Sequence, residues 1–560
     1  MASSYLYSLP LCIVILFLFS SSSLAQDPSS TPVAPENACN STLYPYLCKS
    51  LLPRNQSGNI YDYGRFSVRR SISAATKFSS LIDRYLRGRS KLSATAIRAL
   101  EDCRLLTGLN LDFLSTTINT IGSDKALPSL QADDVQTLLS AIMTNQQTCL
   151  DGLLATASAW SVKNGIYTPL SDGNKLYSVS LALFTRGWVH KKNKAKGRKL
   201  MFSDTEEVRD GRLPLMMSSR IQKMYESASR RKLVQTTIPN VLVSDLVVVS
   251  QDGSGNFTTI NDAVAAAPNN TKASKGYFVI YIAAGVYEEY VSIAKNKKNL
   301  MMIGDGINQT VITGNRSVVD GWTTFNSATL AVVGQGFVAI NITVRNTAGA
   351  IKHQAVAVRN GADLSTFYSC SFEGYQDTLY AHSLRQFYRE CDIYGTVDFI
   401  FGNAAAVFQN CNIYARLPMQ GQFNALTAQG RTDPNQNTGI SIHNCNIRAA
   451  PDLASSSGTT KSYLGRPWKE YSRTVYMQSI IDSLIDPAGW KEWSGNFALS
   501  TLYYAEYNNT GPGSVTTDRV SWPGYHLINA TDAANFTVSN FILGDSWLPA
   551  TIVPYSGGLL

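Results

Sequence analysis

The strongest constraint on the fold of this chain is a repeat of about twenty residues in its second half. Cys370, Cys391 and Cys411 recur 21 and 20 residues apart, each within the same template of apolar and polar positions. In a solenoid each repeat of this length is one coil, and equivalent residues stack along the axis. We therefore expect residues 234–560 to form an all-β right-handed parallel β-helix. The template recurs in residues 341–344, 366–372, 388–393, 408–413 and 442–447.

Two carboxylates follow the same period. Asp377 and Asp398 are 21 residues apart in otherwise apolar surroundings, and Gln354 precedes Gln376 by 22 residues. If one coil separates the two aspartates, their backbones lie about 5 Å apart, the spacing of hydrogen-bonded strands. Two carboxylates this close do not both ionise easily, so the pKa of one is raised and an acid–base pair results. The alternative is that each aspartate only caps a turn of the β-helix.

The first half of the chain has a different character. The length of 560 residues indicates two to four domains. Residues 1–233 hold 29 Lys and Arg against 17 Asp and Glu, so they carry the basic excess of the whole chain. No motif of interleaved basic and aromatic residues accompanies this charge, and we therefore expect no binding of nucleic acid. A solvated basic surface is the simpler interpretation.

The N-terminus predicts a secretory signal peptide over residues 1–25. Residues 11–19 form an apolar stretch, and Ser23-Leu24-Ala25 has the small residues of a cleavage site. An uncleaved signal anchor is the alternative, but the apolar stretch is short for a membrane span. Without Cys12 of this segment, eight cysteines enter an oxidising compartment. Ten N-x-S/T sequons support the same secretory route.

Residues 26–185 have the period of helices. Apolar residues recur at steps of three and four over residues 71–86, 92–106 and 135–154. This pattern predicts an all-α antiparallel four-helix bundle. Four cysteines lie in this part, and several pairings are open. The local choice is a pair of disulfides, Cys39–Cys48 and Cys103–Cys149.

Stacked cysteines of the β-helix have a Cα separation that a disulfide accepts. Our first choice there is Cys391–Cys411, which leaves Cys370 and Cys445 free and buried.

Residues 186–233 form a basic linker between the two parts. It contains a cationic run at residues 191–200 and a second one at residues 229–233. A charge run of this kind is usually a solvated linker. In a secreted chain, exposed dibasic sites at a domain boundary also suit cleavage by a processing protease.

Several enzyme classes lack their signatures here. The chain has no G-x-S-x-G elbow, no P-loop or dinucleotide fingerprint, and its five His residues have no metal-ligand spacing. The aspartate pair remains, with two glutamines and, further along the chain, Arg466 and Trp468. Arg466 would hold one aspartate ionised, and the other would act as general acid. The glutamine amides would stabilise an oxyanion, and Trp468 would stack on a sugar ring.

The motifs of the second half strongly resemble those of the plant pectin methylesterases over roughly residues 238–555. Order and spacing both match. Two positions depart from the family pattern, Val358 and the segment 551–554, and neither carries chemistry. The first half resembles the inhibitor-type pro-region of the same family. The matching stretches are Gly285-Val286-Tyr287-Glu288-Glu289, Gln354-Ala355-Val356-Ala357, Gln376-Asp377-Thr378-Leu379, Asp398-Phe399-Ile400-Phe401-Gly402-Asn403 and Leu464-Gly465-Arg466-Pro467-Trp468.

The resemblance implies a role for each site residue. Asp398 is the nucleophile on the methyl ester, and Asp377 protonates the departing methanol and then activates water. Gln376 and Gln354 stabilise the oxyanion, and Arg466 orients Asp398. The residues implied to contact the sugar acid are Thr329, Gln354, Arg466 and Trp468. No cofactor and no metal are needed.

The resemblance also implies how the chain is processed and where it acts. Arg230-Arg231-Lys232-Leu233 is similar to the family's processing site, and Arg198-Lys199-Leu200-Met201 to a second one. We expect a secreted zymogen, cut by a subtilisin-like protease and acting as a monomer in the cell wall, without a membrane segment in the mature form. Its partners would be methylesterified homogalacturonan and pectin methylesterase inhibitor proteins. Rival hypotheses are a pectin-chain glycosidase or lyase, which also uses β-helices, and a non-catalytic inhibitor or wall-binding protein.

Overall fold

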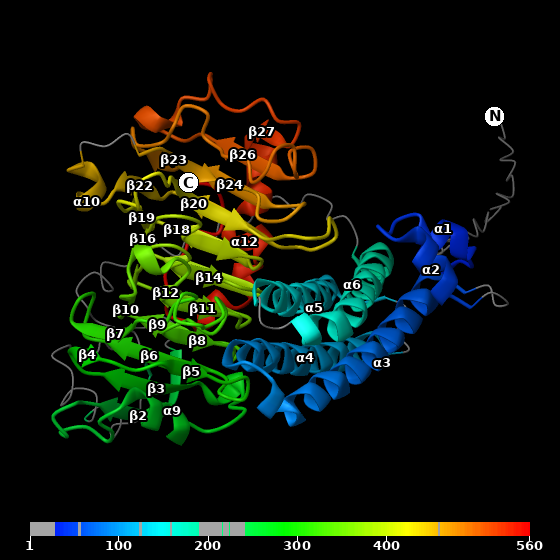
Figure 1. Ribbon diagram of the computed structural model, residues 1–560, viewed down its shortest axis with the longest axis horizontal. Coiled ribbons are helices and arrows are strands. Elements are labelled where there is room, and N and C mark those ends of the chain that lie inside the picture. Colours follow the sequence, from blue (N-terminus) through cyan, green and yellow to red (C-terminus); the bar gives the residue numbers. More distant parts are fainter. Residues whose placement is uncertain are drawn as a thin grey trace, which may run out of the picture.

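A computed structural model describes residues 28–53, 58–122, 126–156, 160–189, 215–216, 223, 241–456 and 460–560. The expected signal peptide, residues 1–25, lies outside these ranges, as do both expected processing sites, residues 198–201 and 230–233. Within the described ranges the chain has two parts, a helical one up to residue 189 and a strand-rich one from residue 241 onward. Figure 1 shows them side by side.

In the described ranges, the helical part consists of two short α-helices followed in sequence by four long ones. The short helices are α1 (Pro35–Cys39) and α2 (Pro45–Leu51). The long ones are α3 (Ile60–Arg87), α4 (Ala94–Ile121), α5 (Ser129–Ala155) and α6 (Trp160–Trp188), which pack against one another. The side chain of Asn59 caps α3 and that of Ser93 caps α4, so orphan backbone N–H groups are satisfied where these helices begin.

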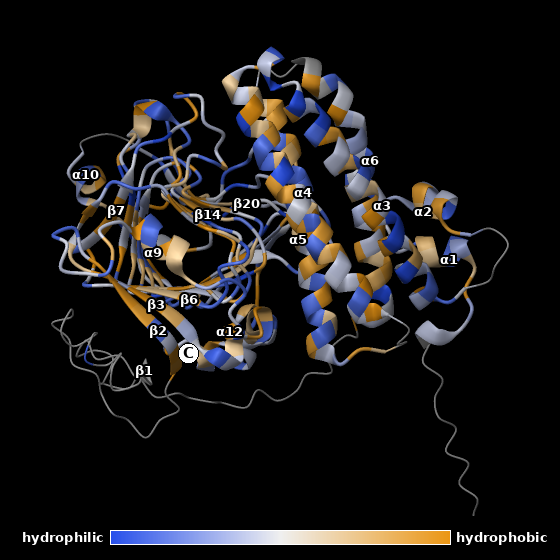
Figure 2. Cartoon of the chain, turned by 90° about the horizontal axis from the view of Figure 1, so that it is seen from below, coloured by the Kyte–Doolittle hydropathy of each residue, from blue (hydrophilic) through white to orange (hydrophobic). Residues whose placement is uncertain are grey.

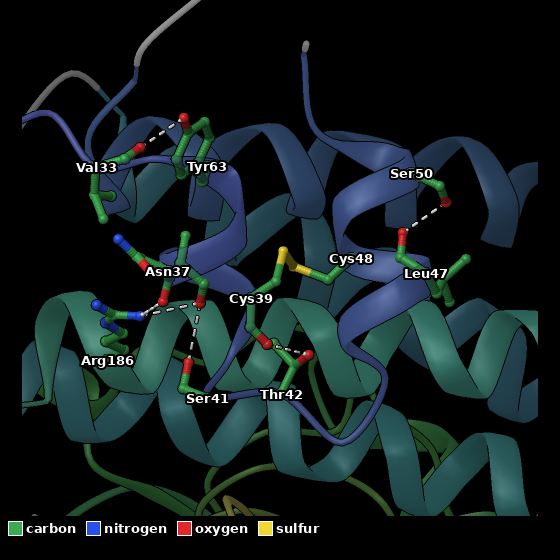
Figure 3. Close-up of a disulfide and its surroundings, with 11 residues drawn as sticks. Val33, Asn37, Cys39, Ser41, Thr42, Leu47, Cys48, Ser50, Tyr63 and Arg186 are labelled. Atoms are coloured by element: carbon green, nitrogen blue, oxygen red, sulfur yellow. Dashed lines mark hydrogen bonds between the residues drawn. A yellow bond between two sulfur atoms is a disulfide. The ribbon is translucent and has the colours of Figure 1, made fainter.

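Two disulfides lie in the helical part, and they are the pairs chosen from the sequence. Cys39–Cys48 joins α1 to α2, and Cys103–Cys149 joins α4 to α5. Figure 3 shows Cys39–Cys48 beside α6, where Arg186 donates a 3.1 Å hydrogen bond to the carbonyl oxygen of Ala38. The short helices are thereby held to the long bundle.

The strand-rich part is a parallel β-helix, as the repeat predicts. Its strands form three parallel sheets, of 12, 8 and 7 strands among the described residues. One coil adds one strand to each sheet, so β12 (Ser365–Tyr368), β13 (Ser371–Glu373) and β14 (Leu379–Ala381) pair with β15, β16 and β17 of the next coil. The 12-strand sheet runs from β1 to β27, the 8-strand sheet from β4 to β25, and the 7-strand sheet from β5 to β23.

The remaining strands of the three sheets have the following bounds. The first sheet contains β1 (Leu215–Met216), β2 (Val241–Val249), β3 (Tyr277–Ile282), β6 (Leu300–Gly304), β9 (Val338–Ile340), β15 (Arg385–Arg389), β18 (Ala405–Gln409), β21 (Gly439–His443), β24 (Arg473–Met477), β26 (Tyr503–Tyr507) and β27 (Tyr525–Leu527). The second contains β4 (Gly285–Tyr287), β7 (Thr310–Gly314), β10 (Thr343–Asn346), β16 (Asp392–Gly395), β19 (Asn412–Ala415), β22 (Asn446–Ala449) and β25 (Ile480–Ile481). The third contains β5 (Val291–Ile293), β8 (Leu330–Val332), β11 (Val358–Asn360), β17 (Ile400–Gly402), β20 (Asn424–Gln429) and β23 (Ser462–Gly465).

The interior of the coils is a stack of equivalent side chains. The rings of Phe367, Tyr388 and Phe408 lie on three successive coils with centroids 5.3 and 4.5 Å apart, nearly parallel. Two short helices pack against the coils. Residues of α9 (Ile260–Ala266) belong to the main core, and α12 (Val538–Phe541) lies on the 12-strand sheet. The other short helices are α10 (Pro451–Ala454) and α11 (Ala530–Ala533). No helix in the described ranges has the length and apolar character needed to cross a membrane.

The predicted disulfide Cys391–Cys411 is wrong. Both residues are buried free thiols in a column with Cys370 and Cys445. Because paired strands run parallel and in register, equivalent side chains point the same way and stack instead of converging on a bond. Each sulfur instead contacts backbone carbonyls; the Sγ of Cys391 lies 3.5 Å from the carbonyl oxygen of Phe367. The backbone spacing permitted a disulfide, but the direction of the side chains does not favour it.

Candidate active site

The two aspartates stand just before the strands of the 7-strand sheet. Asp377 precedes β14 and Asp398 precedes β17, at equivalent positions of adjacent coils. Both have left-handed backbone conformations, with φ of 63° and 54°. Asp tolerates this conformation better than most residues, because its short side chain bonds locally. The turn that begins each strand therefore directs the two carboxylates to the same edge of the sheet.

Arg466 holds Asp398 in a bidentate ion pair. Arg466 follows β23, and its Nε and Nη2 donate 2.7 Å hydrogen bonds to the two carboxylate oxygens of Asp398. The guanidinium group also lies over the ring of Trp493, 4.2 Å from its centroid. This fork geometry satisfies both oxygens at once and favours the ionised carboxylate.

The surroundings separate the pKa values of the two aspartates. Burial, followed by the charge of Asp398, raises the pKa of Asp377 well above its ordinary value, and Arg466 only partly opposes this. Burial also raises the pKa of Asp398, but the hydrogen bonds and charge of Arg466 lower it again. Asp377 is therefore the proton carrier of the pair, and Asp398 is the aspartate that ionises first.

A cavity of about 700 Å³ contains both carboxylates. Five residues predicted for the site line this cavity: Gln354, Gln376, Asp377, Asp398 and Arg466. Trp468 also lines it. Thr329 does not: it is fully buried before β8, and its hydroxyl donates a 3.0 Å hydrogen bond to the carbonyl oxygen of Arg345. The geometry thus gives no support to Thr329 as a sugar-contacting residue.

Aromatic residues that sequence reasoning did not assign to the site form one side of the cavity. Tyr380 and Phe401 occupy paired positions of β14 and β17, with ring centroids 4.2 Å apart, and the ring of Trp468 meets both edge-on. Each lies three positions after one of the two aspartates, so the 21-residue period was a signal for them. That both rings are buried against residues of the helical part could not be predicted from the period. Stacked rings of this kind suit the flat face of a sugar.

The helical part closes the opposite side of the cavity. Figure 2 shows α4 and α5 against the side of the β-helix that carries β14 and β20. On α5, Thr144 accepts a 2.8 Å hydrogen bond from Asn403, and the Thr148 hydroxyl lies 3.0 Å from Nε2 of His382. Thr148, Asp151, Gly152 and Leu154 line the cavity itself. α5 is therefore part of the wall of this cavity.

A second contact forms between α4 and the loop before β8. The carboxylate of Asp102 is buried, and it accepts hydrogen bonds from the Thr323 hydroxyl and the Asn326 amide. Burial raises the pKa of Asp102 to about 7. The charge of Arg359 opposes this rise; Arg359 is a buried residue whose Nε has no hydrogen-bond partner among the described atoms. This contact joins the two parts through polar groups that water no longer reaches.

Metal chemistry has no evident site in the described residues. No three or more of their His, Cys, Asp or Glu side chains are grouped in a way that could hold a metal ion.

The fold and the cavity define an enzyme of the parallel β-helix class, with a carboxylate pair and an arginine in a cleft on one sheet. The chain belongs to the pectinesterase family, whose model, described as "Pectinesterase", matches residues 246–545. A second model, "Plant invertase/pectin methylesterase inhibitor", matches residues 34–183. The chain is therefore an enzyme of this family with an inhibitor-type domain in front of it.

Relatives match over the whole arrangement. "Probable pectinesterase/pectinesterase inhibitor 41" of Arabidopsis thaliana is 62% identical over 93% of this chain and 94% of its own length. "Pectinesterase 2" of Citrus sinensis is 46% identical over 98% of both chains. Among solved structures, "Pectin methylesterase from Carrot" is 57% identical with a TM-score of 0.55, and the match covers 58% of this chain and 100% of that chain.

Proposed function

We propose that this chain hydrolyses the methyl esters of pectin homogalacturonan by a two-step reaction on Asp398 and Asp377, and that the helical part blocks this reaction until the chain is cut. The observation that carries the mechanism is the bidentate pair of Arg466 and Asp398 beside a second carboxyl group, Asp377, with a more strongly raised pKa. One carboxylate is ready to attack, and its neighbour is ready to donate a proton.

In the first step, an oxygen of Asp398 attacks the ester carbonyl carbon. The resulting oxyanion accepts hydrogen bonds from the amides of Gln354 and Gln376, both of which line the cavity. Asp377 gives its proton to the departing methoxy oxygen, so methanol leaves and an acyl–Asp398 anhydride remains. Arg466 keeps Asp398 ionised before the attack.

In the second step, Asp377 is ionised and takes a proton from a water molecule. The hydroxide so formed adds to the galacturonate carbonyl carbon of the anhydride, and the bond to Asp398 breaks. The products are a free galacturonate carboxylic acid, the carboxylate of Asp398 and protonated Asp377, so the site returns to its starting state. The acid then ionises in solution, and each turnover releases one methanol and one proton.

The block by the helical part rests on the shared wall of the cavity. Residues of α5 line it together with both aspartates, and hydrogen bonds between these two helices, α4 and α5, and the β-helix hold the two parts together. Cutting the linker within residues 186–233, with a subtilisin-like protease at Arg230-Arg231-Lys232-Leu233 as the proposed agent, would let the helical part leave. We propose that this happens on the way to, or in, the cell wall, after removal of residues 1–25.

One assay tests the function and separates it from its rivals. The full chain is folded, cut in the linker, freed of its helical part and given methylesterified homogalacturonan. Methanol and an equal amount of protons, with no change in chain length, are the expected products. Shortened or unsaturated chains without methanol would instead show a glycosidase or lyase. Absence of any product from the cut chain would favour a non-catalytic wall-binding protein.

A further inference from the structure

A second cavity, of about 320 Å³, lies between the helical part and the 12-strand sheet. Three arginines of the β-helix line it, Arg385, Arg431 and Arg473. Gln136 of α5 and Phe541 of α12 line it as well, so both parts of the molecule contribute to its walls. Among the described residues, it shares no lining residue with the active-site cavity. It is therefore a separate place in the molecule, rich in positive charge.

The order of strands in the sheet leaves space between two of these arginines. Arg385 begins β15 and Arg473 begins β24. The two strands between them, β18 and β21, begin at the small residues Ala405 and Gly439. Three strand spacings, about 14 Å at backbone level, separate the two arginines. A Cβ atom on Gly439 would lie 3.0 Å from the Nε of Arg473, so the arginine side chain lies against the bare glycine.

The charge of Arg473 is not balanced by a carboxylate of the described residues. Its Nε donates a 2.7 Å hydrogen bond to the carbonyl oxygen of Thr438, but its Nη1 and Nη2 form no hydrogen bond or ion pair within the described ranges. The rings of Phe541 and Phe536 have centroids 5.5 and 5.9 Å from its guanidinium carbon. Burial, and then the charge of Arg431, lowers the pKa of Arg473 well below its ordinary value. Because arginine stays charged in proteins, this buried cation calls for an anionic partner.

The other two arginines differ in how they are paired. Arg385 donates from Nε and Nη2 to the carboxylate of Asp363, and its Nη1 lies 2.8 Å from an oxygen of Asp134 of α5. Arg431 donates through Nε and Nη2 to backbone carbonyl oxygens of its own loop. Its Nη1 has no hydrogen-bond partner in the part of the chain that the structure describes. Arg431 and Arg473 therefore both have donors left for a ligand in the cavity.

Two acidic residues lie close by, and neither is a counter-ion of Arg473. Burial lowers the pKa of Arg431 to about 10, and the charge of Asp433 only partly opposes this. The oxygens of Asp433 accept hydrogen bonds from Ser178 of α6 and from its own loop, and none forms an ion pair with Arg431 in the described ranges. Asp133 of α5 lines the cavity, but its charge is not among those that act on the pKa of Arg473.

The loop that carries Arg431 is also the loop that α5 holds. The side-chain amide of Gln136 donates a 3.0 Å hydrogen bond to the carbonyl oxygen of Asn435. In the opposite direction, the amide of Asn437 donates a 2.8 Å hydrogen bond to the hydroxyl of Thr137. A ligand bound to Arg431 would thus fix this loop in the form that α5 contacts.

We infer that this cavity binds a small phosphate-type oxyanion between Arg431 and Arg473, and that the bound anion strengthens the docking of the helical part. Guanidinium groups present forks of N–H donors that match phosphate oxygens. Donors that approach from a strand and from a loop suit a tetrahedral anion, whose oxygens point in different directions. Because α5 forms part of the wall, the anion binds the docked state better than the separated β-helix and so favours docking. None of this depends on ester hydrolysis.

The first test measures binding of inorganic phosphate to the uncut full chain by titration calorimetry, at constant ionic strength with chloride as the balancing salt. We expect one phosphate per chain, with a Kd of about 1 mM or lower. Arg473→Gln should raise this Kd at least about tenfold, because charge-assisted hydrogen bonds are lost. The matched control is Arg448→Gln, which removes an equal charge from an exposed arginine of β22. Its Kd should stay within about twofold of the parent value.

The second test measures docking in the chain that has been cut in the linker. The dissociation constant of the helical part is determined with chloride alone and with phosphate at about ten times its Kd, again at constant ionic strength. Phosphate should lower this constant several-fold in the parent, toward the limit of about elevenfold for a ligand that binds only the docked state. Arg473→Gln should show no response to phosphate, and Arg448→Gln should respond as the parent does.

The outcomes decide each element of the inference. A parent that binds no phosphate, or a Kd unchanged in Arg473→Gln, overturns the site. Phosphate that binds without changing the dissociation of the helical part overturns its effect on docking. Acetate that binds as tightly as phosphate overturns the tetrahedral assignment. Tighter binding of glycerol 3-phosphate than of inorganic phosphate supports the site, with a phosphate ester as its ligand.

A second variant covers the case in which Arg473→Gln does not fold. Gly439→Ala keeps every charge and places a methyl group 3.0 Å from the Nε of Arg473 and 3.2 Å from the ring of Phe541. A weaker affinity for phosphate in this variant supports the site, since the methyl group takes space beside the guanidinium. An unchanged Kd overturns it.

Discussion

Arg466 donates hydrogen bonds to both carboxylate oxygens of Asp398, with Nε–Oδ1 and Nη2–Oδ2 distances of 2.7 Å, although the two residues are 68 positions apart in the sequence. This pair keeps the pKa of Asp398 from following that of its neighbour Asp377. If Arg466 is changed to Gln, burial acts unopposed and the pKa of Asp398 rises. The acid limb of kcat/KM should then move to higher pH by one unit or more, because an adjacent arginine lowers a carboxyl pKa by about 1–3 units.

The sign of this shift is testable with the cut enzyme. Asp398 must be ionised to attack, so raising its pKa removes activity at acidic pH first and leaves the alkaline limb in place. A pH–rate profile of methanol release, with Arg466→Lys as a variant that keeps the charge but loses the fork, makes the measurement. An acid limb that stays in place in Arg466→Gln would contradict the assigned role.

Asp398→Asn and Asp377→Asn should each abolish methanol release. We expect a loss of at least about 10³-fold in kcat, the scale seen when one member of a catalytic unit is removed. Asn is the replacement to use, because both positions have positive φ and Asn adopts that conformation readily. Asp392→Asn is a matched control on the coil of Asp398, half-buried and bonded to Asn412. Near-normal turnover in either catalytic variant would refute the mechanism.

Docking of the helical part should depend on pH through Asp102. Burial raises its pKa from 3.8 to about 7 in the docked chain, with Glu101 adding to the rise and Thr323 and Arg359 opposing it. The docked state thus holds a proton that the separated helical part has released. Docking is strongest below pH 4 and weakens as the pH rises toward 7. Affinity of the separated parts should fall at least tenfold between these limits, and about one pKa unit of coupling suffices for this.

The Asp102→Asn variant provides the comparison for that measurement. Its amide oxygen still accepts a hydrogen bond from Thr323, but the group does not titrate. Binding of the variant helical part to the β-helix part should therefore lose most of its pH dependence between pH 4 and 7. An unchanged pH slope would mean that other groups at the interface carry the effect.

Replacing Arg198, Lys199, Arg230 and Arg231 together by Gln should keep the chain uncut. Because α5 then stays in the cavity, methanol release by the secreted variant should be at least about tenfold below that of the parent. The N-terminal residue of the protein recovered from the wall identifies the site that is used in the parent. Full activity of a chain proven to be uncut would contradict the proposed block.

Thiol chemistry distinguishes the two parts of the molecule. Titration of the unfolded chain without residues 1–25 should give four free thiols, from the column of buried cysteines in the β-helix. Two thiols would mean that Cys391 and Cys411 are joined after all. Reduction should destabilise the helical part, since loss of a native disulfide such as Cys103–Cys149 costs about 2–5 kcal/mol. The melting of the separated β-helix should not respond to reductant.

The period of about twenty residues predicted the β-helix and the proximity of the two aspartates in the candidate site. Because one coil advances by one strand, a spacing of 21 residues was enough to make Asp377 and Asp398 neighbours. The same reasoning failed for Cys391 and Cys411, since register determines distance along the axis but a bond also requires side chains that converge. The contact of Thr329 with the sugar acid stays a prediction; in this structure its hydroxyl donates to the carbonyl oxygen of Arg345.

The contact between the two parts was beyond prediction from the sequence. The polar residues Thr144 and Thr148 of α5 are buried but fit no apolar stripe. The hydroxyl of Thr144 also donates to the carbonyl oxygen of Ser140 within α5, so nothing in the helix itself indicates a partner outside it. Their partners, Asn403 and His382, lie more than 230 residues away in the chain. Pairings of this kind depend on how two finished surfaces fit, and no local pattern encodes them.

Covalent continuity between α6 and β2 has a kinetic consequence for the enzyme. While the linker is intact, the effective concentration of the helical part at the cavity is in the millimolar range, whatever the concentration of the protein in the wall. After one cut, rebinding becomes bimolecular, and occupancy falls to what the bulk concentration supports. A weak contact can thus keep the uncut chain inactive, and after the cut dilution alone is enough for the helical part to dissociate. The enzyme would then be switched on by a change in local concentration, without rearrangement of the coils that carry its site.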